Sequence, residues 1–364
     1  MKKTGNPIRV LHVIGSISVS NGISAMVMNY YNKLDYSRLI FDFMLNEDVE
    51  ANVRSYIEGN GSRIYIMPEL KAVNTLKYIK NLIEVYKTTD YRIIHGHVAN
   101  SAVLYLGLAR NDTKRIVHSH NTELADIWWK YLRNWILTRF IKLVANEYIA
   151  CSEEAAVSLF GKSRKAYILN NAIDVQAFVY DEKKREEIRG YLGCSNKYVI
   201  GHVGRFCAQK NHSFLLDVFN EVYKRNLDSV LLLIGDGELF NNIKQKAETL
   251  GLSDAVLFLG TKDNVQDYMS AMDVFALPSL FEGLGIVGIE AQASGLRVVS
   301  SAKVPRIIDI TETVDFLPFN IELWVQALLK KAELNRHAMN LKVLQSRFNI
   351  ETQLDCLYKY YEGL

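Results

Sequence analysis

The chain has 364 residues, of which 49% are apolar and 23% are charged, and its formal net charge at pH 7 is +3. This length exceeds one typical domain and suits two, and the composition is that of a globular protein and not of a disordered chain. A net charge this close to zero argues against a protein that binds nucleic acid.

The four cysteines are scattered along the chain and include no CxxC pair. This spacing argues against a zinc site or a redox couple, and it fits a reduced compartment better than a disulfide framework. Near the amino terminus, Arg9 and His12 interrupt the apolar residues, so this segment predicts a strand and not a signal peptide. No apolar run reaches the roughly 18 residues of a membrane-spanning helix, and we expect a cytoplasmic protein.

Short apolar runs alternate with longer amphipathic stretches from one end of the chain to the other. In chain order, the expected strands are 8–14, 41–45, 63–67, 93–97, 115–118, 148–150, 167–169, 198–203, 229–234, 256–259, 274–277, 298–300 and 315–317. The expected helices include 75–87, 181–190, 213–225, 239–250, 265–272, 288–294, 323–334 and 350–361. Alternation of this kind predicts parallel sheets that are covered by helices on both faces.

The pattern divides into two halves that meet near residues 170–180. We therefore predict an α/β fold with two Rossmann-like, doubly wound domains that face a central cleft. The predicted domains are 1–171, completed by the carboxyl-terminal helix within 350–364, and 172–349. In such folds ligands bind outside the carboxyl ends of the strands.

The segment Ser279–Gly295 follows an apolar strand and begins a helix. It holds two carboxylates, Glu282 and Glu290, among glycines that let the backbone approach a ligand closely. The amino end of a helix offers free N–H groups to an anion, and a carboxylate there can accept hydrogen bonds from sugar or ribose hydroxyls. The alternative is a glycine-containing turn that is capped by a glutamate.

Arg205 and Lys210 lie between the expected strand 198–203 and the helix that follows it. Two cations beside a helix amino terminus, at the carboxyl end of a strand, are suited to binding a diphosphate. The alternative is a pair of solvated surface charges.

The segment Ile14–Ser24 follows the first strand but matches neither G-x-G-x-x-G nor the P-loop pattern. This absence argues against a dinucleotide-dependent oxidoreductase and against a P-loop nucleotide hydrolase. Asn21 and Gly22 begin the next helix and could present backbone N–H groups to phosphates.

Four segments resemble motifs of the retaining GT-B glycosyltransferases, a large family that includes sucrose-phosphate synthases and many bacterial polysaccharide and lipopolysaccharide transferases. The segments are YILNNAIDVQAF, VGRFCAQKNHSFLL, LLLIGDGEL and PSLFEGLGIVGIEAQASGLRVV. Three positions depart from the usual residues of the family: Asn170 and Arg297 replace prolines, and Leu284 replaces an aromatic residue. The stretch SSAKVPRIIDITETV lacks the usual glycines and glutamate, which resembles the exopolysaccharide and capsule type.

The resemblance implies transfer of a sugar, with retained anomeric configuration, from a nucleotide-diphosphate sugar such as a UDP-sugar. The acceptor would be a saccharide or lipid-linked saccharide in surface polysaccharide biosynthesis, and neither a metal ion nor a cofactor would be needed. Arg205 and Lys210 would bind the diphosphate, Glu290 the ribose and Glu282 the sugar. The implied donor-binding residues are Asn21, Gly22, Gly204, Arg205, Lys210, Gly235, Glu282, Gly283, Leu284, Gly285, Ile286 and Glu290.

Two other functions fit the same fold. A nucleotide-sugar epimerase would form product without any acceptor, and a non-catalytic subunit would bind the sugar nucleotide without turnover. The sequence predicts neither the acceptor nor the oligomeric state.

Two pairs of histidines, His95 with His97 and His118 with His120, end strands of the first half. Because ligands bind at such strand ends, these side chains are candidates for contact with substrate. By resemblance, His120 would lie beside the donor sugar and act in catalysis, with His118 as the alternative. An imidazole that only caps a strand or helix is the other interpretation.

The segment Asp126–Val144 contains three tryptophans and four cations. A membrane-surface helix would suit a lipid-linked acceptor and would make the protein peripheral at the inner face of the cell membrane. The cations fall on no single face at helical spacing, so a partly buried helix is the alternative.

Overall fold

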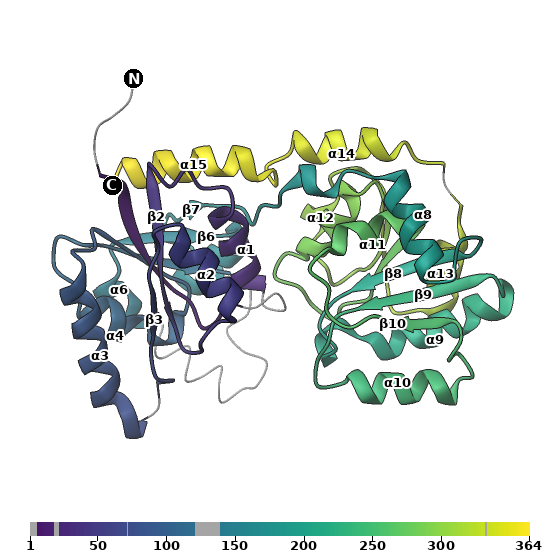
Figure 1. The fold of residues 1–364 in the computed structure, drawn as a ribbon, viewed down its shortest axis with the longest axis horizontal. Coiled ribbons are helices and arrows are strands. Elements are labelled where there is room, and N and C mark those ends of the chain that lie inside the picture. The colour runs from purple at the N-terminus through teal and green to yellow at the C-terminus, as the bar shows by residue number, and fades with distance from the viewer. Residues whose placement is uncertain (1–5, 18–21, 71, 121–138, 332) are drawn as a thin grey trace. The chain divides into compact units, whose positions relative to one another are not determined.

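The computed structural model describes residues 6–17, 22–70, 72–120, 139–331 and 333–364 (Figure 1). The chain forms two compact units. Unit 1 comprises Met1–Asn171 and Ile350–Leu364, and unit 2 comprises Ala172–Asn349. Within the described residues, no helix combines the length and the apolar character needed to cross a membrane.

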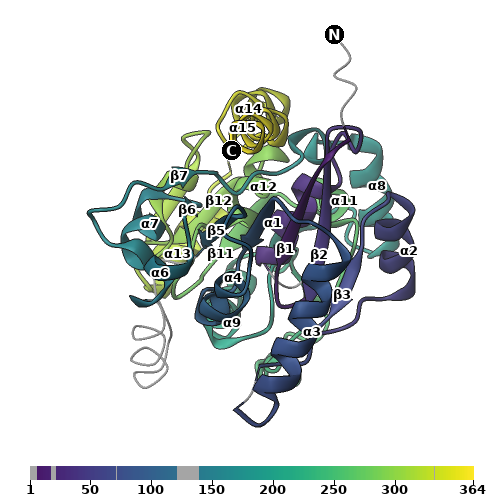
Figure 2. The same cartoon turned by 90° about the vertical axis from the view of Figure 1, so that its left-hand side faces the viewer.

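The described part of unit 1 is built on a seven-stranded parallel sheet with the order β3-β2-β1-β4-β5-β6-β7 (Figure 2). Its strands are β1 Ile8–Val13, β2 Leu39–Leu45, β3 Ile64–Ile66, β4 Ile93–Gly96, β5 Lys114–Ser119, β6 Glu147–Ala150 and β7 Tyr167–Ile168. Its described α-helices are α1 Gly22–Tyr31, α2 Ala51–Gly59, α3 Thr75–Thr88, α4 Ala102–Gly107, α6 Ile141–Val144, α7 Glu153–Phe160 and α15 Ile350–Glu362.

Unit 2 is built on a parallel sheet whose order, among the described residues, is β10-β9-β8-β11-β12-β13. Its strands are β8 Tyr198–Val203, β9 Ser229–Ile234, β10 Val256–Phe258, β11 Val274–Leu277, β12 Arg297–Ser301 and β13 Val314–Leu317. Its α-helices are α8 Glu182–Tyr191, α9 His212–Arg225, α10 Phe240–Thr249, α11 Val265–Ala271, α12 Ile286–Ala293, α13 Ile321–Leu329 and α14 Arg336–Leu344. Both sheets confirm the predicted alternation of strands and helices.

The direction of strand connection reverses once in each sheet. In unit 1 the reversal lies between β1 and β4, and in unit 2 it lies between β8 and β11. In sheets with such a reversal, the loops that leave the neighbouring strands diverge to opposite faces, and ligands bind at the carboxyl ends of these strands. In unit 2 these are the loops that carry the predicted phosphate-binding and sugar-binding residues.

The prediction of a helix over 323–334 is wrong at the carboxyl end of that helix. The helix α13 ends at Leu329, because Lys330 adopts an extended conformation (φ −66°, ψ 109°). A second helix, α14, then begins after Asn335, whose side chain accepts a hydrogen bond from the backbone N–H of Ala338. Asparagine is a favoured residue at this capping position.

The carboxyl-terminal helix α15 packs against unit 1. The hydroxyl of Tyr358 accepts a hydrogen bond from the backbone N–H of Asp35 at 2.6 Å. The guanidinium of Arg38 pairs with Glu362 at 2.7 Å and lies 4.0 Å from the ring centre of Tyr358. These contacts join the last residues of the chain to the loop before β2, so this helix belongs to the first sheet in space although it follows unit 2 in sequence.

Gly96 ends β4 at a point where the fully buried ring of Tyr105, in α4, lies against the strand. A Cβ atom at position 96 would overlap the Tyr105 hydroxyl. The small residue therefore lets α4 approach the sheet closely, between His95 and His97.

Replacing Gly96 by alanine should lower the free energy of unfolding by about 1–3 kcal/mol, the usual effect of overpacking a core. Gly59→Ala in α2 is the matched control, because nothing lies within 4 Å of a Cβ at that position. Chemical denaturation followed by circular dichroism measures both effects. Equal unfolding midpoints for the two variants would contradict this account of the packing.

Candidate functional site

The loop after β8 runs from Gly204 to Asn211 and leads directly into α9. Its last residue, Asn211, has a positive φ of 54° and precedes the first residue of the helix. Asparagine is one of the few residues other than glycine that adopt this conformation readily. The turn therefore places Lys210 at the amino end of α9.

The loop after β11 ends at Gly285, which has a φ of 84° and forms the amino-terminal cap of α12. A residue with a side chain would be strained in this conformation. Three residues further, a Cβ on Gly288 would lie 2.9 Å from Ile308 Cδ1 and 3.2 Å from Leu277 Cδ2. These two glycines therefore determine where α12 begins and how closely it packs on β11.

Lys210 and Glu282 form an ion pair that connects these two loops. The Lys210 ammonium donates to Glu282 Oε1 at 2.5 Å, and the exposed fractions of the two side chains are 17% and 8%. Ser279 Oγ donates to the same carboxylate oxygen at 2.7 Å. An ion pair that is this far from solvent is stable only when further hydrogen bonds satisfy its charges, as they do here.

Gln209 adds a second connection between the loops. Its backbone carbonyl accepts from the N–H of Leu280 at 2.8 Å, and its side-chain amide donates to the carbonyl of Phe281 at 3.0 Å. The same amide lies 3.4 Å from Glu282 Oε2. This oxygen therefore keeps most of its capacity to accept hydrogen bonds from a ligand.

Glu290 lies on the first turns of α12 and is half-buried. Burial raises the pKa of its carboxyl to about 7, and the nearby positive charge of Lys210 opposes this rise. Lys210 thus acts electrostatically on both carboxylates of the segment 279–295.

Arg205 occupies the same loop as Lys210 but extends toward solvent. Its side chain is 57% exposed and lies 3.1 Å from Glu238, which is equally exposed. A pair of this kind contributes little to stability, so the guanidinium is free to change partners. Gly235, with a φ of 136°, lets the turn after β9 lie directly against the backbone of Gly204, where a Cβ would overlap the carbonyl.

The structure thus brings together Lys210, Glu282 and Glu290, which the sequence had predicted in separate roles. Gly283–Ile286 lie on the same loop as Glu282, and Gly204, Arg205 and Gly235 lie on the two adjacent turns. The sequence interpretation missed Ser279 and Gln209. Ser279 could have been suspected, because serine hydroxyls at turns commonly form local hydrogen bonds, whereas the contact of Gln209 depends on the tertiary fold.

The remaining predicted residues belong to unit 1. Gly22 begins α1, but Asn21 lies outside the described residues. Most of the segment Asp126–Val144 also lies outside them, and only its last part is described, including the short helix α6. The membrane-surface and buried-helix interpretations of this segment both stay predictions.

His118 and His120 are both buried, with 1% and 8% of their surfaces exposed. Burial lowers the pKa of His120 to about 3, and burial with neighbouring imidazoles lowers that of His118 as well. Both rings are therefore neutral at pH 7, which excludes an imidazolium as the resting form of either residue.

Known proteins resemble this chain in sequence. A family model described as "Glycosyl transferases group 1" matches residues 183–315, the part of unit 2 that holds the ion pair. The "Putative glycosyltransferase EpsF" of Bacillus subtilis (strain 168) is 32% identical over 346 residues, which are 90% of this chain and 88% of that protein. The chain belongs to the group 1 glycosyltransferase family.

Two further comparisons extend this result. The UDP-Gal:alpha-D-GlcNAc-diphosphoundecaprenol alpha-1,3-galactosyltransferase of Escherichia coli is 26% identical over 324 residues, 83% of this chain and 81% of that enzyme. The crystal structure of HepE from Anabaena in complex with UDP-glucose superposes with a TM-score of 0.80 at 19% identity, covering 98% of this chain and 100% of that chain. These similarities confirm the family and the predicted fold of two Rossmann-like domains.

The raised pKa of Glu290 predicts how stability depends on pH. The carboxyl ionises near 4.5 in the unfolded chain but near 7 in the folded one, so the unfolded chain loses its proton first. The contribution of Glu290 to stability therefore falls as the pH rises from about 4.5 to about 7. Glu290→Gln cannot ionise and should become more stable than the wild type above pH 7, by at most about 3 kcal/mol.

Guanidinium denaturation of both proteins at pH 5 and pH 8 measures this difference. The stability of the variant relative to the wild type should be greater at pH 8 than at pH 5. A difference that is the same at both pH values would show that the Glu290 carboxyl has an ordinary pKa.

Proposed function

We propose that this glycosyltransferase moves a sugar from a UDP-sugar to a saccharide or a lipid-linked saccharide, with the anomeric configuration retained, in the synthesis of a surface polysaccharide. Unit 2 would bind the donor and unit 1 the acceptor. The cluster of Lys210, Glu282 and Glu290 at the strand reversal of unit 2 carries the proposal. The Escherichia coli relative, whose name gives a UDP-sugar donor and a lipid diphosphate acceptor, supports both substrate classes.

Lys210 can bind the donor diphosphate without losing Glu282. An ammonium group has three N–H donors, and the ion pair uses one of them. Arg205 would leave Glu238 and supply a second, planar donor group to the phosphates. As the bond to the sugar breaks, negative charge grows on the departing diphosphate, and cations already in place stabilise it.

The carboxylates would orient the rest of the donor. Glu282, whose Oε2 has only a long contact with Gln209 among the described residues, would accept hydrogen bonds from sugar hydroxyls. Glu290 would accept from the ribose, and the backbone amides of Gly283–Ile286, at the start of α12, would contact the sugar and the phosphates. The acceptor hydroxyl would attack on the face of the leaving group, with the phosphate taking its proton and His120 close to the donor sugar.

Removal of the cations tests the diphosphate site. Lys210→Gln and Arg205→Ala should each lower kcat/KM for the UDP-sugar by about ten- to a hundredfold, because each removes a charge-assisted contact. Lys224→Ala is the control, since Lys224 in α9 pairs only with Glu221 among the described residues and is 60% exposed. Consumption of UDP-glucose and UDP-galactose measures the effect. Thermal unfolding verifies that the Lys210→Gln variant, in which Glu282 has lost its ion-pair partner, still folds. Near-native transfer by the double variant would exclude the assignment.

A chelator tests the proposal that no metal ion takes part. The proposed leaving group is stabilised by two cations and by backbone amides, so turnover in excess EDTA should equal turnover without it. The measurement is UDP release over a range of EDTA concentrations. Loss of turnover that Mg²⁺ or Mn²⁺ restores would show that these groups are insufficient and that the proposed mechanism is wrong.

A further inference from the structure

Five histidines of unit 1 meet at the carboxyl ends of three neighbouring strands. His12 lies on β1, His95 and His97 lie at the end of β4, and His118 and His120 lie at the end of β5. These strands are adjacent in the order β1-β4-β5, and His12 is directly opposite His95. All five side chains are buried, with exposed fractions between 1% and 8%.

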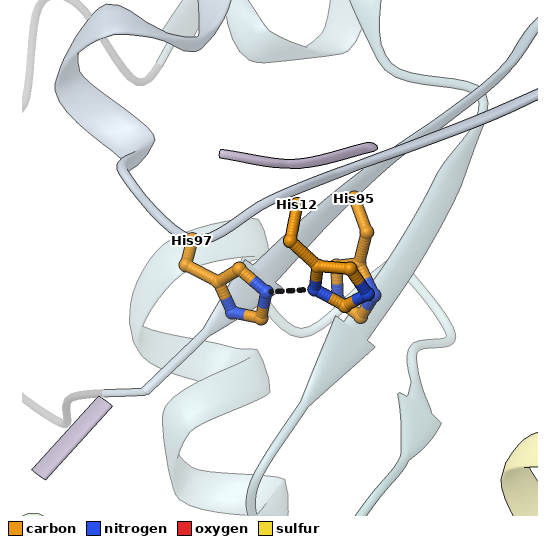
Figure 3. A group of neighbouring side chains, drawn as sticks. All are labelled: His12, His95 and His97. Carbon is orange, nitrogen blue, oxygen red and sulfur yellow. Dashed lines mark hydrogen bonds between the residues drawn. The ribbon is translucent and has the colours of Figure 1, made fainter. Parts of the chain in front are cut away.

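The first chain of hydrogen bonds runs from His12 through His97 to His120. His12 Nδ1 lies 3.0 Å from His97 Nε2, a hydrogen bond that Figure 3 draws as a dashed line. His97 Nδ1 lies 2.8 Å from His120 Nε2. At the two ends, His12 Nε2 and His120 Nδ1 are buried and have no hydrogen-bond partner within the described ranges.

The second chain of hydrogen bonds begins at Tyr361, on the carboxyl-terminal helix α15. The Tyr361 hydroxyl lies 2.5 Å from His95 Nδ1, and His95 Nε2 lies 3.1 Å from His118 Nδ1. This chain ends at His118 Nε2, which is also buried and has no partner in the part of the molecule that the structure describes.

The hydrogen-bonded tyrosine determines the protonation of the second chain. Each imidazole is neutral, because burial lowers its pKa, and a neutral imidazole has one N–H donor and one acceptor nitrogen. The buried Tyr361 hydroxyl has His95 as its one hydrogen-bond partner among the described residues, so its O–H donates a hydrogen bond to His95 Nδ1. His95 then donates from Nε2 to His118 Nδ1, and His118 holds its own proton on Nε2.

The surroundings of His12 determine the direction of the first chain. Its ring packs against Phe41 with the ring centres 4.0 Å apart, and Phe43 lies at 6.2 Å. Either direction of this chain leaves one buried N–H without a partner among the described residues, at His12 or at His120. The His12 end packs against phenylalanine rings, whereas the His120 end follows a strand at the carboxyl edge of the sheet, where a ligand can supply the acceptor. His12 therefore leaves its Nε2 unprotonated and donates from Nδ1 to His97, which donates in turn to His120, so that His120 holds its proton on Nδ1.

We propose that His118 Nε2 and His120 Nδ1 form a pair of N–H donors for an oxygen atom of a substrate, and that Tyr361 and His12 are positioning residues that determine the tautomers of this pair. The two rings are stacked with centres 4.0 Å apart. Both donors are buried without a partner among the described residues, which is rare in native proteins and calls for an explanation, and a bound ligand atom supplies one. The oxygen belongs to a phosphate group or to a sugar hydroxyl, an assignment that rests on the proposed function.

A metal ion is the competing ligand, because one nitrogen from each of His97, His118 and His120 lies within 4.8 Å of the others. Three imidazoles are a common set of ligands for Zn²⁺. A metal ion, however, requires unprotonated nitrogens, whereas the Tyr361 hydroxyl directs a proton onto His118 Nε2. The two ligands therefore demand opposite tautomers of His118.

Two-bond ¹H–¹⁵N spectra of the whole protein, labelled with ¹⁵N-histidine, identify these tautomers without any turnover. His118 should be protonated on Nε2 and His120 on Nδ1. Tyr361→Phe should convert His118 into a mixture of tautomers. Tyr358→Phe, on the same helix, is the matched control and should leave His118 unchanged, because the Tyr358 hydroxyl bonds to the backbone of Asp35 and, among the described residues, to no histidine.

Ligand titrations in the same spectra identify the source of the oxygen. Inorganic phosphate should shift the His118 and His120 signals if the pair binds a phosphate oxygen, and glucose should do so if it binds a sugar hydroxyl. UDP-glucose contains both groups. Failure of all three ligands to move either signal would overturn the donor pair.

Kinetics separate positioning from a purely structural role. Tyr361→Phe should lower kcat for UDP release two- to tenfold, the loss of roughly one neutral hydrogen bond, with little change in KM. His12→Leu should lower kcat as well, and His12→Asn, which retains an N–H donor toward His97, should recover part of the rate that His12→Leu loses.

Three results would contradict the proposal: His118 protonated on Nδ1, one equivalent of tightly bound Zn²⁺ that removes the N–H signals, or a Tyr361→Phe spectrum identical to that of the wild type. A wild-type enzyme with the expected tautomers that never consumes a UDP-sugar would instead contradict the proposed function and leave the positioning roles standing.

Discussion

The ion pair between Lys210 and Glu282 is the interaction on which the site in unit 2 depends. It joins the loop after β8 to the loop after β11, the two strands between which the sheet reverses its order. Removing one partner would leave a charge away from water, which typically costs 3–5 kcal/mol. The pair therefore orders both loops before any ligand arrives, and two of the three lysine donors stay available.

The two units build different electrostatic environments on the same topology. In unit 2 the strand ends carry a lysine, an arginine and two glutamates, of which Glu290 has a raised pKa because it is buried. In unit 1 the corresponding strand ends carry neutral imidazoles, whose pKa values burial lowers. Charge in unit 2 suits a diphosphate that gains negative charge during reaction, whereas neutral donors in unit 1 suit a hydroxyl or phosphate oxygen without requiring a change of protonation.

Sequence patterns predicted the strands well because parallel strands covered on both faces are nearly continuous apolar runs. Ser229–Ile234 is buried at every position, and so is Leu39–Leu45. Local signals also predicted the turns, since glycine at 285 is required by the backbone itself. Helix ends were less predictable, and the break between Leu329 and Arg336 was missed because the apolar pattern continues across it.

The sequence placed the candidate site residues on the correct loops but could not pair them. Lys210 and Glu282 are 72 residues apart, and their contact exists only after the sheet has formed. The sequence interpretation treated His12 only as an interruption of an apolar run. A histidine near the end of a predicted strand could also have indicated a polar network. The role of Tyr361 could not be found locally, because α15 reaches His95 only through the return of the chain to unit 1.

Calorimetric titration of the whole protein with nucleotides tests the central claim most directly. The account predicts that UDP binds at one site per chain, more tightly than GDP or ADP, and that CMP, which lacks a second phosphate, binds far more weakly. Binding of UDP should weaken in Lys210→Gln, because the diphosphate would lose its cation. A protein that binds none of these nucleoside diphosphates, or binds CMP as tightly as UDP, would contradict the assignment of the Lys210–Glu282–Glu290 cluster to the donor diphosphate.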